Sequence, residues 1–131
     1  MQIKDYLNEI LDTIASSPYI DSQNLSFEER APNAVYINGM CVFINGSRLY
    51  FKEFIIFKSE SINFLKYGYN YVDKDNILIF RYDNALDPHV KKLSTYPEHK
   101  HQPDRLLPAK RPALEGVLRE IAHLIERNAE R

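Results

Sequence analysis

The chain has 131 residues, of which 44% are hydrophobic and 12% aromatic, and it carries a formal net charge of −1 at pH 7. This length and composition exclude a disordered linker and predict one α+β domain over residues 1–131 with a single hydrophobic core. The near-neutral charge does not by itself indicate a nucleic-acid partner, so local clusters of charge carry that information.

The N-terminal residues carry no signal for secretion or membrane insertion. Polar side chains interrupt residues 1–17 at every second or third position, so no continuous apolar stretch forms there. Cys41 is the only cysteine and excludes an internal disulfide. Its apolar neighbours predict a buried, unreactive thiol. We therefore expect a soluble, cytoplasmic protein without a membrane partner.

An amphipathic helix is predicted at each end of the chain. Apolar residues recur at spacings of three and four over residues 2–16, and Ser16-Ser17-Pro18 ends that pattern. The same spacing runs from Leu114 to Ile125, after Pro112 at a position where the first turn of a helix accepts proline. His123 falls outside this apolar stripe and is expected to be exposed.

Between the helices the sequence predicts an antiparallel meander. Four runs rich in branched and aromatic residues cover residues 34–44, 47–58, 63–72 and 76–83, and a weaker run covers 24–31. Asn45-Gly46 joins the first two runs and favours a tight hairpin. The predicted fold class is α+β, with a four- to five-stranded twisted sheet, two terminal helices and a long proline-rich loop before the last helix.

That loop covers residues 85–110. Prolines at 88, 97, 103 and 108 disfavour a helix or a central strand, which predicts an irregular segment. Long loops in compact domains are uncommon and often functional. The stretch from His89 to Arg111 is also locally basic: it has Lys or Arg at 91, 92, 100, 105, 110 and 111, acids only at 98 and 104, and three histidines.

The strand register follows if every connection is a two-residue turn. Turns at 45–46, 60–61 and 74–75 then place one row of residues across the sheet: Asn38, Glu53, Gly68 and Arg81. The next row is Tyr36, Ile55, Lys66 and Asp83. Glu53, Arg81 and Asp83 would gather at one end of this face, as a functional site or as a structural ion pair between Glu53 and Arg81.

The opposite face of this predicted sheet is aromatic. It would carry Tyr50, Phe54, Tyr67, Tyr69, Tyr71, Phe80 and Tyr82. Aromatic strips of this kind more often form a core under a helix than a platform for stacking bases. We therefore expect these side chains to be buried.

The polar residues around the end of the last strand allow three interpretations. Arg81, Asp83, Asn84, His89, His99 and His101 are expected to converge there, because the loop must return to begin the last helix. In the first interpretation the histidines move protons and Arg81 or Lys100 stabilises a phosphate, as in a metal-independent ribonuclease. In the second, Asp83 and the three histidines bind a divalent transition metal that activates water. In the third, the histidines are structural or solvated.

The order of several motifs resembles the TumE-like toxin family over roughly residues 34–125. The motifs are EFIIF at 53–57, YNY at 69–71, FRYDNA at 80–85, His89 and YPEHKH at 96–101. The resemblance implies a toxin subunit of a two-gene toxin–antitoxin module, neutralised by a helix-turn-helix antitoxin. RNA is the commonest target of such toxins, so ribonuclease activity is inferred by class. By position, the resemblance implies seven candidate residues: Glu53, Arg81, Asp83, Asn84, His89, His99 and His101. Asn70 stands where the family pattern leads us to expect a histidine.

The sequence thus predicts the toxin of a type II-like module that acts on RNA without a metal. The catalytic candidates are His99, His101, Arg81, Asp83 and Glu53, with the two acids as orienting groups. The substrate-binding candidates are Lys100, Lys91, Lys92, Asn84 and His89. The alternatives are a non-catalytic module that binds nucleic acid or protein, and a hydrolase with a divalent metal as its cofactor. Exposed sheet edges favour an antitoxin complex or a homodimer.

Overall fold

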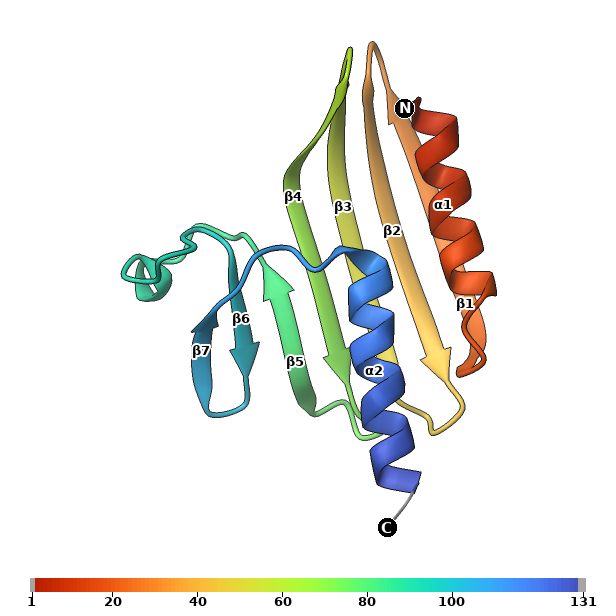
Figure 1. The fold of residues 1–131 in the computed structure, drawn as a ribbon, viewed down its shortest axis with the longest axis vertical. Helices are drawn as coiled ribbons and strands as arrows, with labels where there is room; N and C mark the ends of the chain where they lie inside the picture. The colour runs from red at the N-terminus through yellow and green to blue at the C-terminus, as the bar shows by residue number, and fades with distance from the viewer. Residues whose placement is uncertain (1, 130–131) are drawn as a thin grey trace.

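The computed structural model describes residues 2–129, which form one seven-stranded antiparallel sheet with two helices on the same face (Figure 1). The strands lie side by side in sequence order from β1 to β7. The elements are α1 (Ile3–Ala15), β1 (Ile20–Arg30), β2 (Ala34–Phe43), β3 (Arg48–Lys58), β4 (Ser61–Val72), β5 (Leu78–Asp83), the 3₁₀ helix η1 (Pro88–Val90), β6 (His99–Gln102), β7 (Arg105–Pro108) and α2 (Ala113–Ala129).

The predicted α+β class and antiparallel meander are confirmed, but the strand count of four to five is wrong. The weak run at 24–31 is part of the long edge strand β1, and the loop predicted to be irregular contains the hairpin β6–β7. Pro103 lies in the turn between β6 and β7, and Pro108 ends the edge strand β7. Proline is compatible with both positions because neither requires an N–H in the middle of a ladder.

The core lies between the helices and one face of the sheet, which we call the helix-covered face. The apolar stripes of α1 and α2 bury residues such as Ile10 and Ile121 against it. Cys41 is fully buried, as predicted, and burial raises the pKa of its thiol to about 11. His123 is exposed, as predicted. No helix within residues 2–129 combines the length and apolar character needed to span a membrane.

The other face, which we call the open face, has no helix over it in Figure 1. Strand alternation divides the predicted aromatic strip between the two faces. Tyr67, Tyr69, Tyr71, Phe80 and Tyr82 are buried with the core, as predicted. The other two aromatic residues, at positions 50 and 54, lie on the open face because they alternate with buried neighbours along β3.

The predicted register of the first hairpin is wrong by one residue. Glu53 pairs with Ile37 rather than with Asn38. The connection has three residues instead of two: the Gly46 amide donates to the Phe43 carbonyl, and Gly46 has φ +84°. A type I turn followed by a left-handed glycine is the usual three-residue hairpin loop. Because strand side chains alternate, the single extra residue moves Glu53 to the helix-covered face.

The second connection keeps two residues but lies at 59–60 rather than 60–61, and an irregularity next to Phe54 then shifts the register of β4. The third connection is longer than predicted. The Asp73 side chain accepts hydrogen bonds from the amides of Asp75 and Ile77, and Asn76 adopts φ +67°, so a longer turn joins β4 to β5. Gly68 consequently pairs with Asp83 rather than with Arg81. The row observed on the open face is Asn38, Lys52, Gly68, Asp83 and His99.

Candidate functional site

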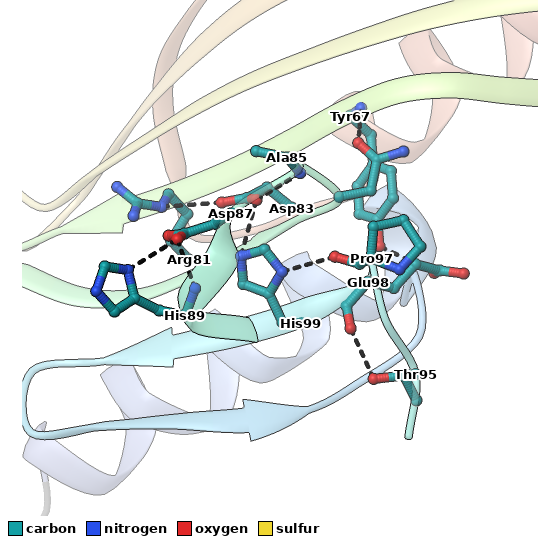
Figure 2. A network of polar contacts seen from close by, with 11 residues as sticks. Tyr67, Arg81, Asp83, Ala85, Asp87, His89, Thr95, Pro97, Glu98 and His99 are labelled. Carbon is teal, nitrogen blue, oxygen red and sulfur yellow. Dashed lines mark hydrogen bonds and ion pairs between the residues drawn. The ribbon is translucent and has the colours of Figure 1, made fainter. Parts of the chain in front are cut away.

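The pairing of β5 with β6 brings the ends of two predicted motifs together on the open face. Asp83 lies opposite His99, and Arg81 lies opposite His101. Because residues two apart on a strand share a face, all four side chains project to the same side. Figure 2 shows the Arg81, Asp83 and His99 side chains in one polar network, with Asp87 and His89 beside them. We call these six residues the polar cluster.

Asp83 is the centre of the polar cluster. Its Oδ1 accepts a hydrogen bond from the Ala85 amide at 2.9 Å and lies 3.0 Å from His99 Nε2. Its Oδ2 accepts from Arg81 Nε at 3.1 Å. Three N–H groups, from the Ala85 amide, Arg81 and His99, thus surround the Asp83 carboxylate. Asp83 therefore fixes both a guanidinium and an imidazole at the end of β5.

His99 is almost fully buried, with 1% of its surface exposed. Its Nε2 faces the Asp83 carboxylate, and its Nδ1 lies 2.7 Å from the Pro97 carbonyl oxygen. Both neighbours are acceptors, so both contacts are hydrogen bonds only when both ring nitrogens carry protons. Both ring nitrogens of His99 are therefore occupied by contacts within the chain.

His101 packs edge-on against His99, with ring centroids 4.7 Å apart and an interplanar angle of 79°. Neither of its ring nitrogens forms a hydrogen bond within residues 2–129, and the residue is partly exposed. Partial burial and the positive charges of Arg81 and His99 lower the pKa of His101 from its ordinary value of 6.5. The side chain is therefore a neutral imidazole at pH 7 with a nitrogen free to accept a proton.

Asp87 and His89 lie at the exposed rim of the cluster. Asp87 Oδ1 accepts a hydrogen bond from the His89 amide and lies 2.9 Å from His89 Nδ1. These contacts lower the pKa of the Asp87 carboxyl, and its charge also acts on His101. The His89 side chain is 84% exposed. A substrate on the open face can reach it without rearrangement.

Lys100, predicted to bind substrate, lies on the helix-covered face. It sits between the two histidines of β6, so alternation turns it away from them. Its Nζ lies 2.7 Å from Glu120 Oε2 of α2 and 4.8 Å from the centre of the Tyr82 ring. Lys100 therefore anchors β6 to α2 and does not reach the polar cluster.

The other predicted substrate-binding residues are dispersed. Lys91 and Lys92 are exposed in the segment between η1 and β6. The Asn84 side chain accepts from the Tyr67 amide and donates to the Leu65 carbonyl, both at 3.1 Å. Asn84 thus extends the pairing of β4 beyond the end of β5, with its side chain at the edge of the open face.

Glu53 is fully buried on the helix-covered face, away from the cluster. Its carboxylate accepts hydrogen bonds from the hydroxyls of Tyr6 and Tyr69 and lies 3.0 Å from Arg111 Nη2. Burial and the Glu53 charge raise the pKa of Tyr6 well above its ordinary value of 10, so its hydroxyl remains a donor. The ion pair predicted between Glu53 and Arg81 is therefore wrong, because Arg111 is the partner of Glu53.

A hollow of about 1040 Å³ lies on the open face beside the cluster. Its lining includes Arg81 and Asp83, and also Lys52 and Lys66, which the sequence analysis did not select. Lys52 is opposite Gly68 in the next strand, and Gly68 is opposite Asp83. The two-residue turn assumed at 45–46 placed Glu53, rather than Lys52, between Asn38 and Gly68 in this row. A three-residue loop ending at Gly46 would have placed Lys52 there.

Three residues of the cluster offer the donor types that a transition metal prefers. Single donor atoms of Asp83, His99 and His101 lie within 4.8 Å of one another. However, both nitrogens of His99 and both oxygens of Asp83 already take part in hydrogen bonds within the chain. A metal would have to replace the contact between Asp83 and His99. The donor types fit a metal, while the observed contacts are complete without one.

An antiparallel meander with both helices on one face and a histidine–arginine–aspartate cluster on the other defines a small α+β protein with an exposed polar site. The family model described as toxin TumE matches residues 10–128, so the chain belongs to the TumE toxin family. This membership suggests a toxin role and an antitoxin partner. No curated protein and no solved structure matches the chain.

Proposed function

We propose that this toxin is a metal-independent ribonuclease whose active site is the polar cluster on the open face. The observation that carries the proposal is the pairing of Arg81 with His101 beside the buried pair of Asp83 and His99. It provides a neutral base, a cation and a fixed support within two neighbouring strands. These are the parts that transesterification of a ribose phosphate requires.

In the proposed reaction His101 accepts the proton of the ribose 2′-hydroxyl as the 2′-oxygen attacks the phosphorus. The guanidinium of Arg81 donates hydrogen bonds to the non-bridging phosphate oxygens, on which negative charge increases. The bond from phosphorus to the 5′-oxygen breaks, and that oxygen takes a proton from the protonated ring of His89, which is exposed and lies beside Asp87. The products are a 2′,3′-cyclic phosphate and a 5′-hydroxyl.

His99 and Asp83 are positioning residues in this scheme. Asp83 holds the Arg81 guanidinium through Nε, which leaves the terminal nitrogens for phosphate. His99 fixes Asp83 and packs against the ring of His101. Glu53 and Lys100 have no part in the chemistry, because both project to the helix-covered face.

A metal-dependent hydrolase is the second candidate. It is favoured by the donor atoms of Asp83, His99 and His101, which lie within 4.8 Å of one another. The first candidate is preferred because the same atoms already satisfy one another. Only the hydrolase requires a metal ion, so a chelator distinguishes the two candidates.

We further propose that the protein acts in the cytoplasm and is neutralised there by a helix-turn-helix antitoxin from the same module. The family membership supports an antitoxin, and a ribonuclease toxin meets its RNA in the cytoplasm. The long outer edge of β1 offers unpaired backbone groups to such a partner or to a second copy of the chain.

Expression in cells with and without the gene next door tests this function. The toxin alone is expected to stop growth and to fragment cellular RNA, and co-expression of the antitoxin is expected to restore both. His101→Ala is expected to abolish growth arrest at equal protein level. Arrest that persists in this variant, with intact RNA, would identify the non-catalytic binding module instead.

A further inference from the structure

The hollow on the open face has a charge that differs from that of the whole protein. The chain has a net charge of −1, yet the charged residues of the hollow are Lys52, Lys66, Arg81 and Asp83. Asp83 is already paired with His99 and Arg81. The two lysines, in contrast, form no ion pair within residues 2–129. The hollow therefore presents unneutralised positive charge next to the proposed active site.

Lys52 lies in the same row of the sheet as Asp83, with only Gly68 between them. A Cβ atom placed on Gly68 would lie 3.5 Å from Lys52 Cε and 3.9 Å from Asp83 Cβ. The Lys52 side chain therefore lies against Gly68, and the glycine leaves space between Lys52 and Asp83. Any larger residue at position 68 would fill this gap. The glycine thus keeps open a path from the hollow to the cluster.

The rest of the lining is rich in side-chain amides. Asn24 of β1 and Asn70 of β4 lie in one row across the sheet, and Asn38 of β2 lies in the neighbouring row. The Oδ1 atom of Asn70 is buried and has no hydrogen-bond partner within the described chain. A buried acceptor without a partner is costly, and an N–H donor supplied by a ligand would satisfy it. Amide side chains also match the donor and acceptor edges of unpaired bases.

We propose that this hollow binds the single-stranded RNA segment next to the cleaved phosphate, with Lys52 and Lys66 on its phosphates and the asparagine amides on its bases. The inference rests on the proposed function, since it names the form of RNA that the active site receives. A single strand is required because its base edges are free to reach the floor of the sheet. A polyanion fits the hollow because it combines cations and amides with the exposed ring of Tyr50, on which a base can stack.

The test measures binding separately from cleavage. The probe is a fluorescent single-stranded 2′-O-methyl RNA octamer, which lacks the hydroxyl that attacks the phosphate and so stays intact. We expect it to bind the wild-type protein. Lys52→Gln is expected to weaken binding about fivefold, the upper end of what an exposed ion pair contributes. The double variant with Lys66→Gln is expected to reduce the slope of log K against log salt by about 1.4, since each phosphate contact on a single strand contributes about 0.7.

Lys58→Gln is the matched control. Lys58 lies on the same strand and the same face as Lys52 but outside the hollow, so its loss should leave affinity unchanged. Failure of the probe to bind, or equal affinities for Lys52→Gln and Lys58→Gln, would overturn the inference. Loss of antitoxin binding in Lys52→Gln with unchanged RNA binding would overturn it as well, because the hollow would then be a protein interface. Specific probe binding together with absent cleavage of ordinary RNA would instead reject the proposed ribonuclease reaction.

Discussion

Three histidines of similar sequence context have three different environments. His99 is buried between two acceptors, His101 is half-buried with free nitrogens, and His89 is exposed beside Asp87. Environment rather than residue type sets which imidazole carries a proton. The roles proposed for them, positioning for His99, base for His101 and acid for His89, are based on these surroundings.

Arg81 is proposed to stabilise the transition state and to lower the pKa of His101, and one substitution tests both effects. Arg81→Gln removes a cation from the transition state and is expected to reduce the cleavage rate by about 10²-fold or more. It also removes a positive charge that lowers the pKa of His101, so the acid limb of the pH–rate profile should move to higher pH. Rates measured from pH 4.5 to 8 check both effects.

Arg105→Gln is the control for that profile. Arg105 is exposed at the start of β7 and hydrogen bonds to Gln102, away from the catalytic residues. Its rate and profile should match those of the wild type. An unchanged acid limb in Arg81→Gln would show that His101 is not the titrating base.

The lowered pKa of His101 also predicts how stability depends on pH. Because the folded state takes up this proton less readily than the unfolded chain, the contribution to stability is fully present above the unfolded pKa of about 6.5. It is lost as pH falls from there through the lower pKa of the folded state. His101→Gln should weaken this dependence, whereas His123→Gln, on the exposed side of α2, should not. Urea unfolding at pH 5.5 and 7.5 measures the difference.

At the level of elements, a buried polar network joins the helices to the sheet. Arg111, just before α2, pairs with Glu53 of β3 and donates to the hydroxyls of Tyr6 and Tyr69. Its guanidinium also lies over the Phe64 ring at 3.4 Å from the centroid. Removing one partner of a buried pair leaves the other charge uncompensated.

Arg111→Met is therefore expected to lower the free energy of unfolding by about 3 kcal/mol. The matched variant is Arg119→Met, because Arg119 pairs with Glu115 on the exposed side of α2, with both side chains more than half exposed. That variant should cost no more than about 0.5 kcal/mol. Denaturant titration compares the two, and equal losses would show that the Glu53 network does not stabilise the fold.

The elements with strong periodicity were predictable from sequence, whereas the register and the last hairpin were not. Helix stripes and β-rich runs depend on local patterns that span ten residues or more. The register depends on turn length, and one extra residue at Gly46 was enough to place Glu53 on the wrong face. The four prolines of residues 85–110 concealed β6 and β7, which are short edge strands that tolerate proline.

Because β6 was not predicted, the sequence analysis grouped Lys100 with the two histidines of the candidate site. Treating residues 99–101 as a loop left no reason to separate Lys100 from its two neighbours. As a strand, the same three residues alternate, so Lys100 turns to α2 and the histidines turn to Asp83 and Arg81. The meeting of the β5 end with the histidine motif was predictable, because the chain must return toward the last helix.

At the scale of the whole molecule, one face of the sheet forms the core and the other carries the candidate site. Helices cover one face and form the core with it (Figure 1). The other face carries the polar cluster and the basic hollow. A substrate strand can therefore cross β2 to β5 without disturbing the core. The proposed chemistry and the proposed RNA path lie on the same surface.

A metal-independent reaction makes a further prediction for the intact protein. Cleavage should proceed at an unchanged rate in 5 mM EDTA, used at roughly a thousandfold excess over protein, since no step in the scheme requires a metal ion. Stoichiometric zinc or another transition metal in the purified protein, with activity lost on chelation and restored by that metal, would support the second candidate.

The most direct test of the central claim is cleavage of single-stranded RNA by the purified protein, compared between the wild type, His101→Ala and Lys100→Gln. The account predicts fragments ending in 2′,3′-cyclic phosphate for the wild type, with cleavage about 10²- to 10⁴-fold slower in His101→Ala. Lys100→Gln, from the same strand but the opposite face, should cleave like the wild type. Intact RNA with the folded wild-type protein, or equal rates for the wild type and His101→Ala, would contradict it.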